Sequence, residues 1–304
     1  MNGIVIGLLA AFLQSCSYLA SGRYARETGR PAWTLLAPAF FVSGIVSLSA
    51  LPFAMPESAP GVPAPDWSRL IPAATLCVAF CIAGNAATVR MLRHVDASRV
   101  SPLLALKVPL FAVAYSFVPK SAPTAAQWLA VALVVVSAAL LAGAGRRIPR
   151  AGWGWLLCAC VFFCLSDRCI TWCFDLSREA CGGSLLRYTA FTLCVVYSCG
   201  GVLSAAAMAA LGVPDRRTWL RHALPYAAAW YCAMVALFVC FALSGLVLGN
   251  IAQSTRGLLS VMLGWLVARA GRTDMEERVG AATMLRRVAA AALIVAAMAL
   301  YCVE

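Results

Sequence analysis

The chain contains 304 residues, of which 62% are hydrophobic and 12% are charged. Because soluble domains carry about 25% charged residues, this composition indicates an integral membrane protein and not a soluble one. A net charge of +12 would favour nucleic acid as the partner of a soluble protein. Here the arginines stand in short segments between apolar runs, where membrane topology explains them better, so no nucleic-acid partner is expected.

A helix needs about 20 mostly apolar residues to cross the hydrocarbon core of a bilayer, so the chain has room for roughly ten such helices. Five prolines from Pro52 to Pro65 predict a loop, and the polar segment 272–285 is interpreted as an interfacial helix of open function. In chain order the predicted spans are residues 3–20, 33–51, 70–92, 97–118, 124–144, 152–173, 184–211, 223–243, 246–268 and 286–303.

The chain contains an internal repeat. Residues 250–267, NIAQSTRGLLSVMLGWLV, have a counterpart 149 residues earlier, SPLLALKVPLFAVAYSFV. Each segment is apolar with one cation near its middle, and the offset pairs Arg256 with Lys107. The offset also keeps the first four spans of the two halves in register. We therefore predict an all-α integral membrane fold of ten transmembrane helices, arranged as two five-helix repeats at residues 1–145 and 150–304.

Basic residues fall in alternate gaps between spans, and the alternation changes phase between the halves. They follow the first and third spans of the first half, but the second and fourth spans of the second half. Cytoplasmic segments collect Lys and Arg, so every basic gap is cytoplasmic if the halves are inverted and both termini are non-cytoplasmic. Inverted repeats with a midplane site are characteristic of secondary transporters. The residues concerned are Arg23, Arg26, Arg30, Arg90, Arg93, Arg99, Arg216, Arg217, Arg221, Arg269, Arg272 and Arg278.

Residues 91–143 contain the run MLRHVDASRVSPLLAL…VPLFAVAYSFV…QWLAVALVVVSAALLAG, with a basic turn, a small-residue helix and a polar break before the last helix. In this run and in the five-plus-five arrangement, the chain resembles the EamA-like ten-helix members of the drug/metabolite transporter superfamily. The resemblance covers nearly the whole chain and implies a multi-pass transporter of the cell (inner) membrane. The acidic residue that the family has after its fourth helix is missing in the first half, where Lys120 to Pro123 stand, while Glu276 and Glu277 lie nearby in the second half.

The two cations in the repeat are the leading candidates for a substrate site. Arg256 and Lys107 lie roughly 17 Å and roughly 15 Å into their spans at 1.5 Å per residue, close to the membrane midplane. Leaving a cation there costs at least about 2.5 kcal/mol, so such residues usually face a cavity or a partner. We expect both to bind an anionic group of a substrate; alternatively, both are structural and tied to helix carbonyls or to Asp167. One helical stripe contains Gly249, Gln253, Arg256, Ser260 and Gly264.

Other polar residues within the predicted spans have two readings each. Asp167, next to Arg168, could be a proton-coupling carboxylate or the counter-ion of a buried cation. The uncharged candidates could line a substrate path or form hydrogen bonds between helices. They are Gln14, Ser17, Tyr18 and Asn85.

The sequence offers no catalytic signature. HExxH, GxSxG, a P-loop and paired intramembrane carboxylates do not occur, which argues against a membrane hydrolase or an ATP-driven pump. The fourteen cysteines form no CxxC pair and lie mostly in apolar runs, where they read as small packing residues. With only two histidines, we expect no metal site and no cofactor.

The leading hypothesis is a secondary transporter that moves a small organic metabolite with a carboxylate or phosphate, such as an amino acid, by alternating access. One alternative is a lipid-handling membrane protein that acts on an anionic lipid, which predicts a lateral opening and a basic groove. Another is a scaffold without transport. The expected partners are a small-molecule substrate and the lipid bilayer, with a proton or a counter-substrate as candidate coupling partners. The oligomeric state stays open, and a monomer is compatible with the sequence.

Overall fold

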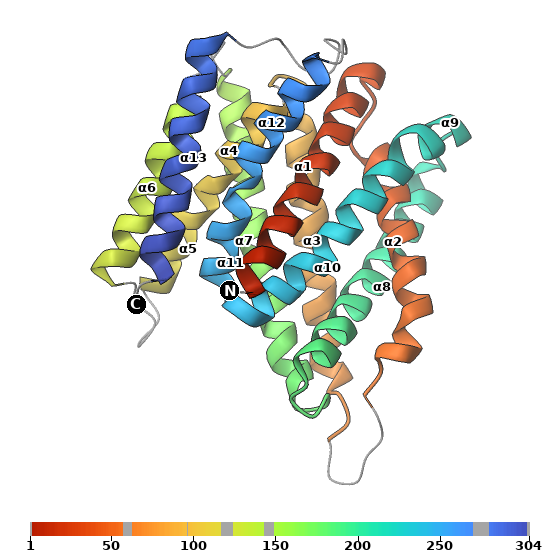
Figure 1. Ribbon diagram of the computed structural model, residues 1–304. Helices are drawn as coiled ribbons and strands as arrows, with labels where there is room; N and C mark the ends of the chain where they lie inside the picture. The colour runs from red at the N-terminus through yellow and green to blue at the C-terminus, as the bar shows by residue number, and fades with distance from the viewer. Residues whose placement is uncertain are drawn as a thin grey trace.

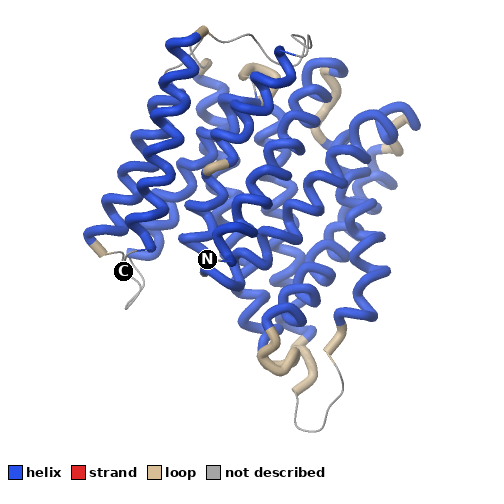
Figure 2. The backbone as a smooth tube through the Cα atoms, in the orientation of Figure 1, coloured by secondary structure: helices blue, strands red, loops and turns tan. Residues whose placement is uncertain are grey.

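The protein is a bundle of helices in a computed structural model that describes residues 2–56, 63–95, 97–116, 124–142, 149–269 and 280–302 (Figures 1 and 2). No strand occurs within these ranges, so the all-α prediction is confirmed for them. The elements are α1 (Asn2–Thr28), α2 (Trp33–Ala54), α3 (Trp67–Met91), α4 (Ala97–Leu103), η1 (Leu104–Leu106), α5 (Lys107–Ser116), α6 (Ala125–Ala142), α7 (Arg150–Arg178), α8 (Leu185–Leu211), α9 (Arg216–Thr218), η2 (Trp219–Ala223), α10 (Leu224–Ser244), α11 (Leu246–Ser254), α12 (Arg256–Arg269) and α13 (Ala281–Cys302).

Six helical units are long and apolar enough to cross a membrane: α1, α2, α3, α7, α8 and the continuous unit from Arg216 to Ser244. This confirms a multi-pass protein. At the other four predicted spans, 97–118, 124–144, 246–268 and 286–303, the described apolar helices are shorter or interrupted. The count of ten spans therefore remains a prediction from the sequence.

Several boundaries differ from the predictions; α1, for example, ends at Thr28 and not at residue 20. The prediction that a loop starts at Pro52 was wrong, because α2 continues through Pro52 to Ala54. The helix ends with a hydrogen bond from Met55 N–H to the Leu51 carbonyl, 2.9 Å long. A proline in the last turn removes one backbone donor, which membrane helices tolerate where neighbouring groups compensate. The predicted interfacial helix at 272–285 lies mostly outside the described residues, which resume at Gly280. The last helix, α13, begins at Ala281.

Two of the predicted spans are interrupted at corresponding positions, where continuous helices were expected. In the first half, α4 passes into the 3₁₀ turn η1, and α5 begins at Lys107. In the second half, α11 ends at Ser254, Thr255 forms a turn, and α12 begins at Arg256. Each cation is thus the first residue after an interruption.

Local chemistry accounts for both interruptions. Pro109, in the first turn of α5, has no N–H to donate to the carbonyl of Ala105. The α-helical hydrogen bond between these two residues is therefore missing, and the interruption at η1 lies at this point. In the second half, the Thr255 hydroxyl donates to the Ala252 carbonyl over 2.7 Å, in place of a pure backbone pattern. Irregular backbone at membrane depth is tolerated where protein buries it or where it lines a cavity.

The most extensive helix contacts join one half of the chain to the other. These pairs are α1 with α10, α2 with α8, α3 with α7 and α6 with α13, while α12 packs on both α1 and α4. A large cluster of buried apolar side chains extends over α1, α2, α3, α7, α8 and α10, and a smaller one joins α5, α6, α11 and α13. In Figure 1, α6 and α13 lie at one edge of the bundle, while α2 and α8 lie at the other.

A pair of glycines sets the distance between α2 and α8. A Cβ atom on Gly201 would lie 2.9 Å from the Cα of Gly44, and a Cβ on Gly44 would overlap the backbone of Gly201. Real Cβ atoms do not approach so closely, so both positions need a residue without a side chain. The helices thereby pack backbone against backbone, as small-residue crossings allow in membrane proteins.

Charged residues join α1 to α9 and η2 at one end of the bundle, at the top of Figure 1. Glu27 pairs with Arg221 at 3.3 Å, and Arg30 pairs with Asp215. Asp215 also caps α9 by accepting from the backbone N–H of Thr218 over 3.2 Å. The hydrogen bonds from Arg30 and Thr218 lower the pKa of Asp215 to about 2. This carboxylate therefore stays ionised at neutral pH.

Candidate functional site

A cavity lies inside the bundle where helices of both halves converge: α1, α3, α5, α7, α8, α10, α11 and α12 all contribute to its wall. Its free volume is about 20 Å³, which is room for about one water molecule. Its polar lining gathers on one side. That side consists of Gln14, Tyr18, Lys107, Asp167, Gln253 and Arg256.

Lys107 forms a buried ion pair. Its Nζ donates to Asp167 Oδ2 on α7 over 2.9 Å, and it also donates to Gln253 Oε1 on α11. The side chains of Lys107 and Asp167 are only 3% and 7% exposed, so the pair is separated from bulk water. The reading of Asp167 as counter-ion of a buried cation fits this geometry. Its neighbour Arg168 is exposed and donates to Thr171 Oγ1 over 2.8 Å.

Arg256 is as deeply buried, but no carboxylate among the described residues contacts it. Its Nη1 donates to Gln14 Oε1 over 3.1 Å, and its guanidinium lies over the Tyr18 ring, 5.6 Å from the ring centroid. Its backbone carbonyl accepts from the Ser15 hydroxyl over 3.0 Å. Two further donors, Nε and Nη2, are buried and have no hydrogen-bond partner within the part of the chain that the structure describes.

The polar side of the cavity therefore carries unequal charge. Lys107 and Arg256 supply two positive charges, and Asp167 supplies one negative charge. A buried cation without a counter-ion is costly at membrane depth and is usually found where a protein handles charged substrates. The remaining charge makes this side of the cavity suitable for an anion.

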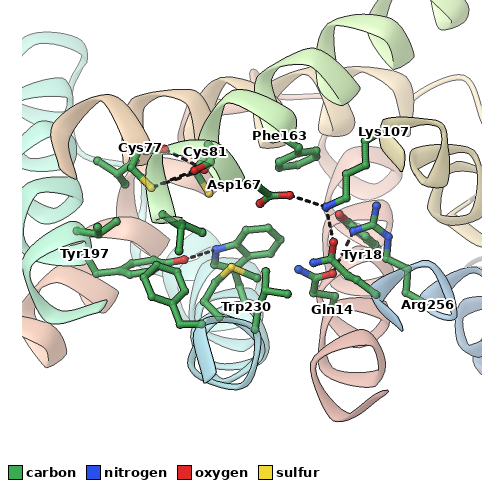
Figure 3. Close-up of a pocket in the computed structure, with 18 residues that line it drawn as sticks. Gln14, Tyr18, Cys77, Cys81, Lys107, Phe163, Asp167, Tyr197, Trp230 and Arg256 are labelled. Carbon is green, nitrogen blue, oxygen red and sulfur yellow. Dashed lines mark hydrogen bonds and ion pairs between the residues drawn. The ribbon is translucent and has the colours of Figure 1, made fainter. Parts of the chain in front are cut away.

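The opposite side of the cavity is aromatic and apolar (Figure 3). The Trp230 indole N–H donates to the Tyr197 hydroxyl over 3.0 Å, which fixes both rings at this wall. The Phe163 ring stacks on Trp230 with centroids 6.5 Å apart, and Phe238 lies nearby in the lining. Figure 3 shows Lys107 and Arg256 at the end of the cavity away from Tyr197.

Six of the eight predicted site residues meet at this cavity. They are Arg256, Lys107, Gln253, Asp167, Gln14 and Tyr18. The other two, Ser260 and Asn85, are buried but lie outside its lining. Asn85 accepts from the Tyr226 hydroxyl over 2.8 Å, which is the interhelical hydrogen bond that the sequence left open as an alternative. Ser17 also lies outside the lining and donates to the Gln14 carbonyl over 2.7 Å.

Sequence reasoning missed the aromatic wall. Trp230, Tyr197 and Phe238 stand in apolar runs where nothing distinguishes a cavity residue from a core residue. For Phe163 a signal existed, because it stands 149 residues after Gln14 and thus at the repeat-related position of a candidate site residue.

A second, more open cavity, of about 560 Å³, lies between α2, α3 and α8 and includes Arg90 and Arg93. The Arg90 guanidinium lies 4.5 Å from the ring centroid of Trp155, and Arg93 donates to the backbone carbonyl of Arg30. Both cations are therefore engaged with protein groups. Within the described ranges, no group of three His, Cys, Asp or Glu residues is arranged to hold a metal ion.

The solved structures contain relatives of this fold. One crystal structure aligns with 100% of this chain and 98% of its own, with a TM-score of 0.63 and 16% sequence identity. At this identity the likeness supports the fold alone. No curated protein matches the sequence.

The sequence model of the EamA-like transporter family matches residues 1–143. The match covers nearly the same residues as the first predicted repeat, and the members of that family are membrane transporters and not enzymes. It places the first half of this protein, with its apolar helices, in the drug/metabolite transporter superfamily.

Proposed function

We propose that this protein is a secondary transporter that carries a small organic anion across the cell (inner) membrane by alternating access. The observation that supports this most directly is the enclosed cavity with one uncompensated positive charge, built by helices of both halves. In the present conformation the side chains nearly fill the cavity, so substrate entry requires helices to move apart.

Two inverted five-helix repeats, residues 1–145 and 150–304, would provide that movement. The helix contacts favour this arrangement. If each helical unit is related to the fifth unit after it, the pair α1 with α10 corresponds to α7 with α3, and both pairs are among the most extensive in the bundle. The interruptions that precede Lys107 and Arg256 lie at equivalent positions under the same relation.

The cavity lining favours a substrate with an anionic group at one end and an apolar body at the other. Arg256 and Lys107 suit a carboxylate or phosphate, because guanidinium and ammonium groups donate charge-assisted hydrogen bonds. Trp230 and Phe163 suit an aliphatic or aromatic body. An amino acid or a related metabolite has both parts. The carboxylate of Asp167 is the candidate group for proton coupling, and exchange for a counter-substrate is the other candidate mode.

The test is transport by purified protein in liposomes. Labelled amino acids, organic acids and phosphate compounds are offered to vesicles preloaded with the unlabelled compound, and counterflow is measured for wild type, Arg256→Ala and Arg168→Gln. We expect at least one anion to accumulate with wild type and with Arg168→Gln, whose side chain is exposed. Loss of a hydrogen bond to a charged group costs about 1.5–3 kcal/mol, so Arg256→Ala should weaken the apparent affinity by about 10- to 100-fold.

Two results would contradict the proposal. Equal counterflow by Arg256→Ala and wild type would show that Arg256 does not bind the substrate. Failure of every soluble anion, combined with movement of a fluorescent anionic lipid between leaflets of the same vesicles, would replace solute transport by lipid handling. The lipid assay is run on the same preparations, so the two outcomes can be compared directly.

A further inference from the structure

The two membrane-depth cations occupy equivalent positions in the repeat but have different surroundings. Lys107 and Arg256 are 149 residues apart, and each begins a helix directly after an interruption. The same separation relates Tyr18 on α1 to Asp167 on α7. The residue beside each cation is therefore an aspartate in one half and a tyrosine in the other.

Beside Lys107, the site is closed by two side chains of the second half. The Asp167 carboxylate accepts from Lys107 Nζ over 2.9 Å, and the Gln253 amide oxygen accepts from the same ammonium group. Both charged side chains are almost completely buried. The positive charge of Lys107 is thus already matched by a carboxylate, and an incoming anion would have to displace it.

Beside Arg256, the corresponding place holds no negative charge. The Tyr18 ring lies under the Arg256 guanidinium, and its hydroxyl is buried without a hydrogen-bond partner among the described side chains. The side chain of Gln14 satisfies only Nη1 of Arg256. Arg256 and Tyr18 are 2% and 1% exposed, and both belong to the lining of the cavity.

The unpartnered donors of Arg256 also have a geometry that suits a ligand. Nε and Nη2 lie on the same edge of the planar guanidinium, and their N–H groups point in parallel. This edge matches the two oxygens of a carboxylate, which can accept both hydrogen bonds at once. A buried arginine with one such edge unoccupied leaves strong donors unsatisfied unless a ligand supplies the acceptors.

We propose that Arg256 and the Tyr18 hydroxyl form the subsite that binds the carboxylate of the substrate, at the place that corresponds to the position of Asp167 beside Lys107. This assignment rests on the proposed transport function and specifies which cation takes the anion. The excess of one positive charge on this side of the cavity equals the charge of a monocarboxylate, whereas a phosphate monoester brings about −1.5 to −2 at pH 7. The Lys107–Asp167 pair joins the two halves to each other and takes no part in binding the anion.

The repeat provides its own test, because Tyr18→Asp places a carboxylate where the other half already has one. Tyr18→Asn is the matched control, because asparagine has nearly the same size as aspartate and no charge. Benzoate, phenylalanine and inorganic phosphate serve as probes, with benzamide as the neutral counterpart of benzoate. Thermal stabilisation and calorimetric titration are measured on the full chain in detergent, for wild type and both variants.

We expect benzoate or phenylalanine, but not benzamide, to stabilise wild type and Tyr18→Asn. Tyr18→Asp should lose at least tenfold in affinity for the same probe, and without any probe it should melt at a higher temperature than Tyr18→Asn. Arg256→Lys and Tyr18→Phe give a second measurement should Tyr18→Asp fail to fold. Arg256→Lys keeps the charge but removes the two-donor edge, and it should lose about tenfold in affinity, while Tyr18→Phe should lose less.

Three outcomes would overturn the assignment, and they can be told apart. Binding of benzoate or phenylalanine by Tyr18→Asp with wild-type affinity would show that the anion binds elsewhere, and the proposed transport of an anion would stand. Binding of phosphate without either carboxylate would overturn the carboxylate class alone. If none of the three probes (benzoate, phenylalanine and phosphate) binds wild type and no anion shows counterflow, the proposed function itself fails, and the assignment fails with it.

Discussion

At the scale of single residues, two opposing free-energy contributions act on the buried pair of Lys107 and Asp167. Removing both charges from water is expensive, and their attraction over 2.9 Å repays this cost only while both partners are present. The hydrogen bond from Lys107 to Gln253 adds a neutral acceptor but no charge. The pair therefore stabilises the fold less by its presence than its disruption would destabilise it.

This predicts a marked non-additivity of substitutions. Lys107→Met alone and Asp167→Leu alone should each lower the free energy of unfolding by about 3–5 kcal/mol, because each leaves an uncompensated buried charge. The double variant should lose much less, because apolar side chains of similar volume can fill the same space. Thermal unfolding of the four proteins in one detergent measures the coupling.

Arg168→Gln serves as the control for this cycle, because Arg168 neighbours Asp167 in sequence but is exposed and should change stability by less than about 0.5 kcal/mol. Additive losses in the double variant would contradict a buried pair. They would mean that the two side chains act independently.

At the scale of helices, the sequence predicted position and type better than continuity. Each predicted span coincides with described helices and most boundaries agree within five residues, because long apolar runs between charged or proline-rich segments leave few alternatives. The missing donor at Pro109, and with it a free Ala105 carbonyl near Lys107, follows from the sequence. The interruption before Arg256 was not predicted, since it depends on a side-chain hydrogen bond at Thr255. Such local competitions produce no periodic signal.

The crossing of α2 and α8 leads to a prediction about two glycines. In Gly44→Ala, the new Cβ would overlap the Gly201 backbone, so the helices must separate, and overpacking of this kind costs about 1–3 kcal/mol. In Gly154→Ala the new Cβ would meet nothing within 4 Å, and the better helix propensity of alanine should raise stability by up to about 1 kcal/mol. Thermal unfolding of both variants beside wild type checks the difference in sign. A Gly44→Ala variant as stable as wild type would mean that α2 and α8 do not pack at this distance.

At the scale of the whole molecule, part of the candidate site followed from the sequence and part did not. The charged side was predictable, because a cation within an apolar run needs a special environment wherever the helix packs. The aromatic wall was not, since Trp230 and Tyr197 become cavity residues only through the packing of α8 and α10 around the space. The pairing of Lys107 with Asp167 was one of two open readings of that carboxylate, and the ion pair depends on the contact between α5 and α7, which the sequence does not show.

The orientation of the molecule in the membrane gives a last prediction. If the halves are inverted, the turn at Gly183 is non-cytoplasmic and the segment at Val213 is cytoplasmic, on opposite sides of α8. A short epitope inserted at either position should be detected by antibody only in right-side-out vesicles for Gly183 and only in inside-out vesicles for Val213. Insertion at Gly29, in the turn between α1 and α2, should match Val213 although the two lie in different halves.

The pattern of accessibility distinguishes two kinds of failure. If all three epitopes exchange sides, the repeats keep their inversion, and only the inference from arginine placement is wrong, with both termini then cytoplasmic. If Gly29 instead matches Gly183, the two halves do not have the predicted opposite orientation. Lys107 and Arg256 would then not be related by inversion, and the argument that Tyr18 stands in the place of an aspartate would lose its basis.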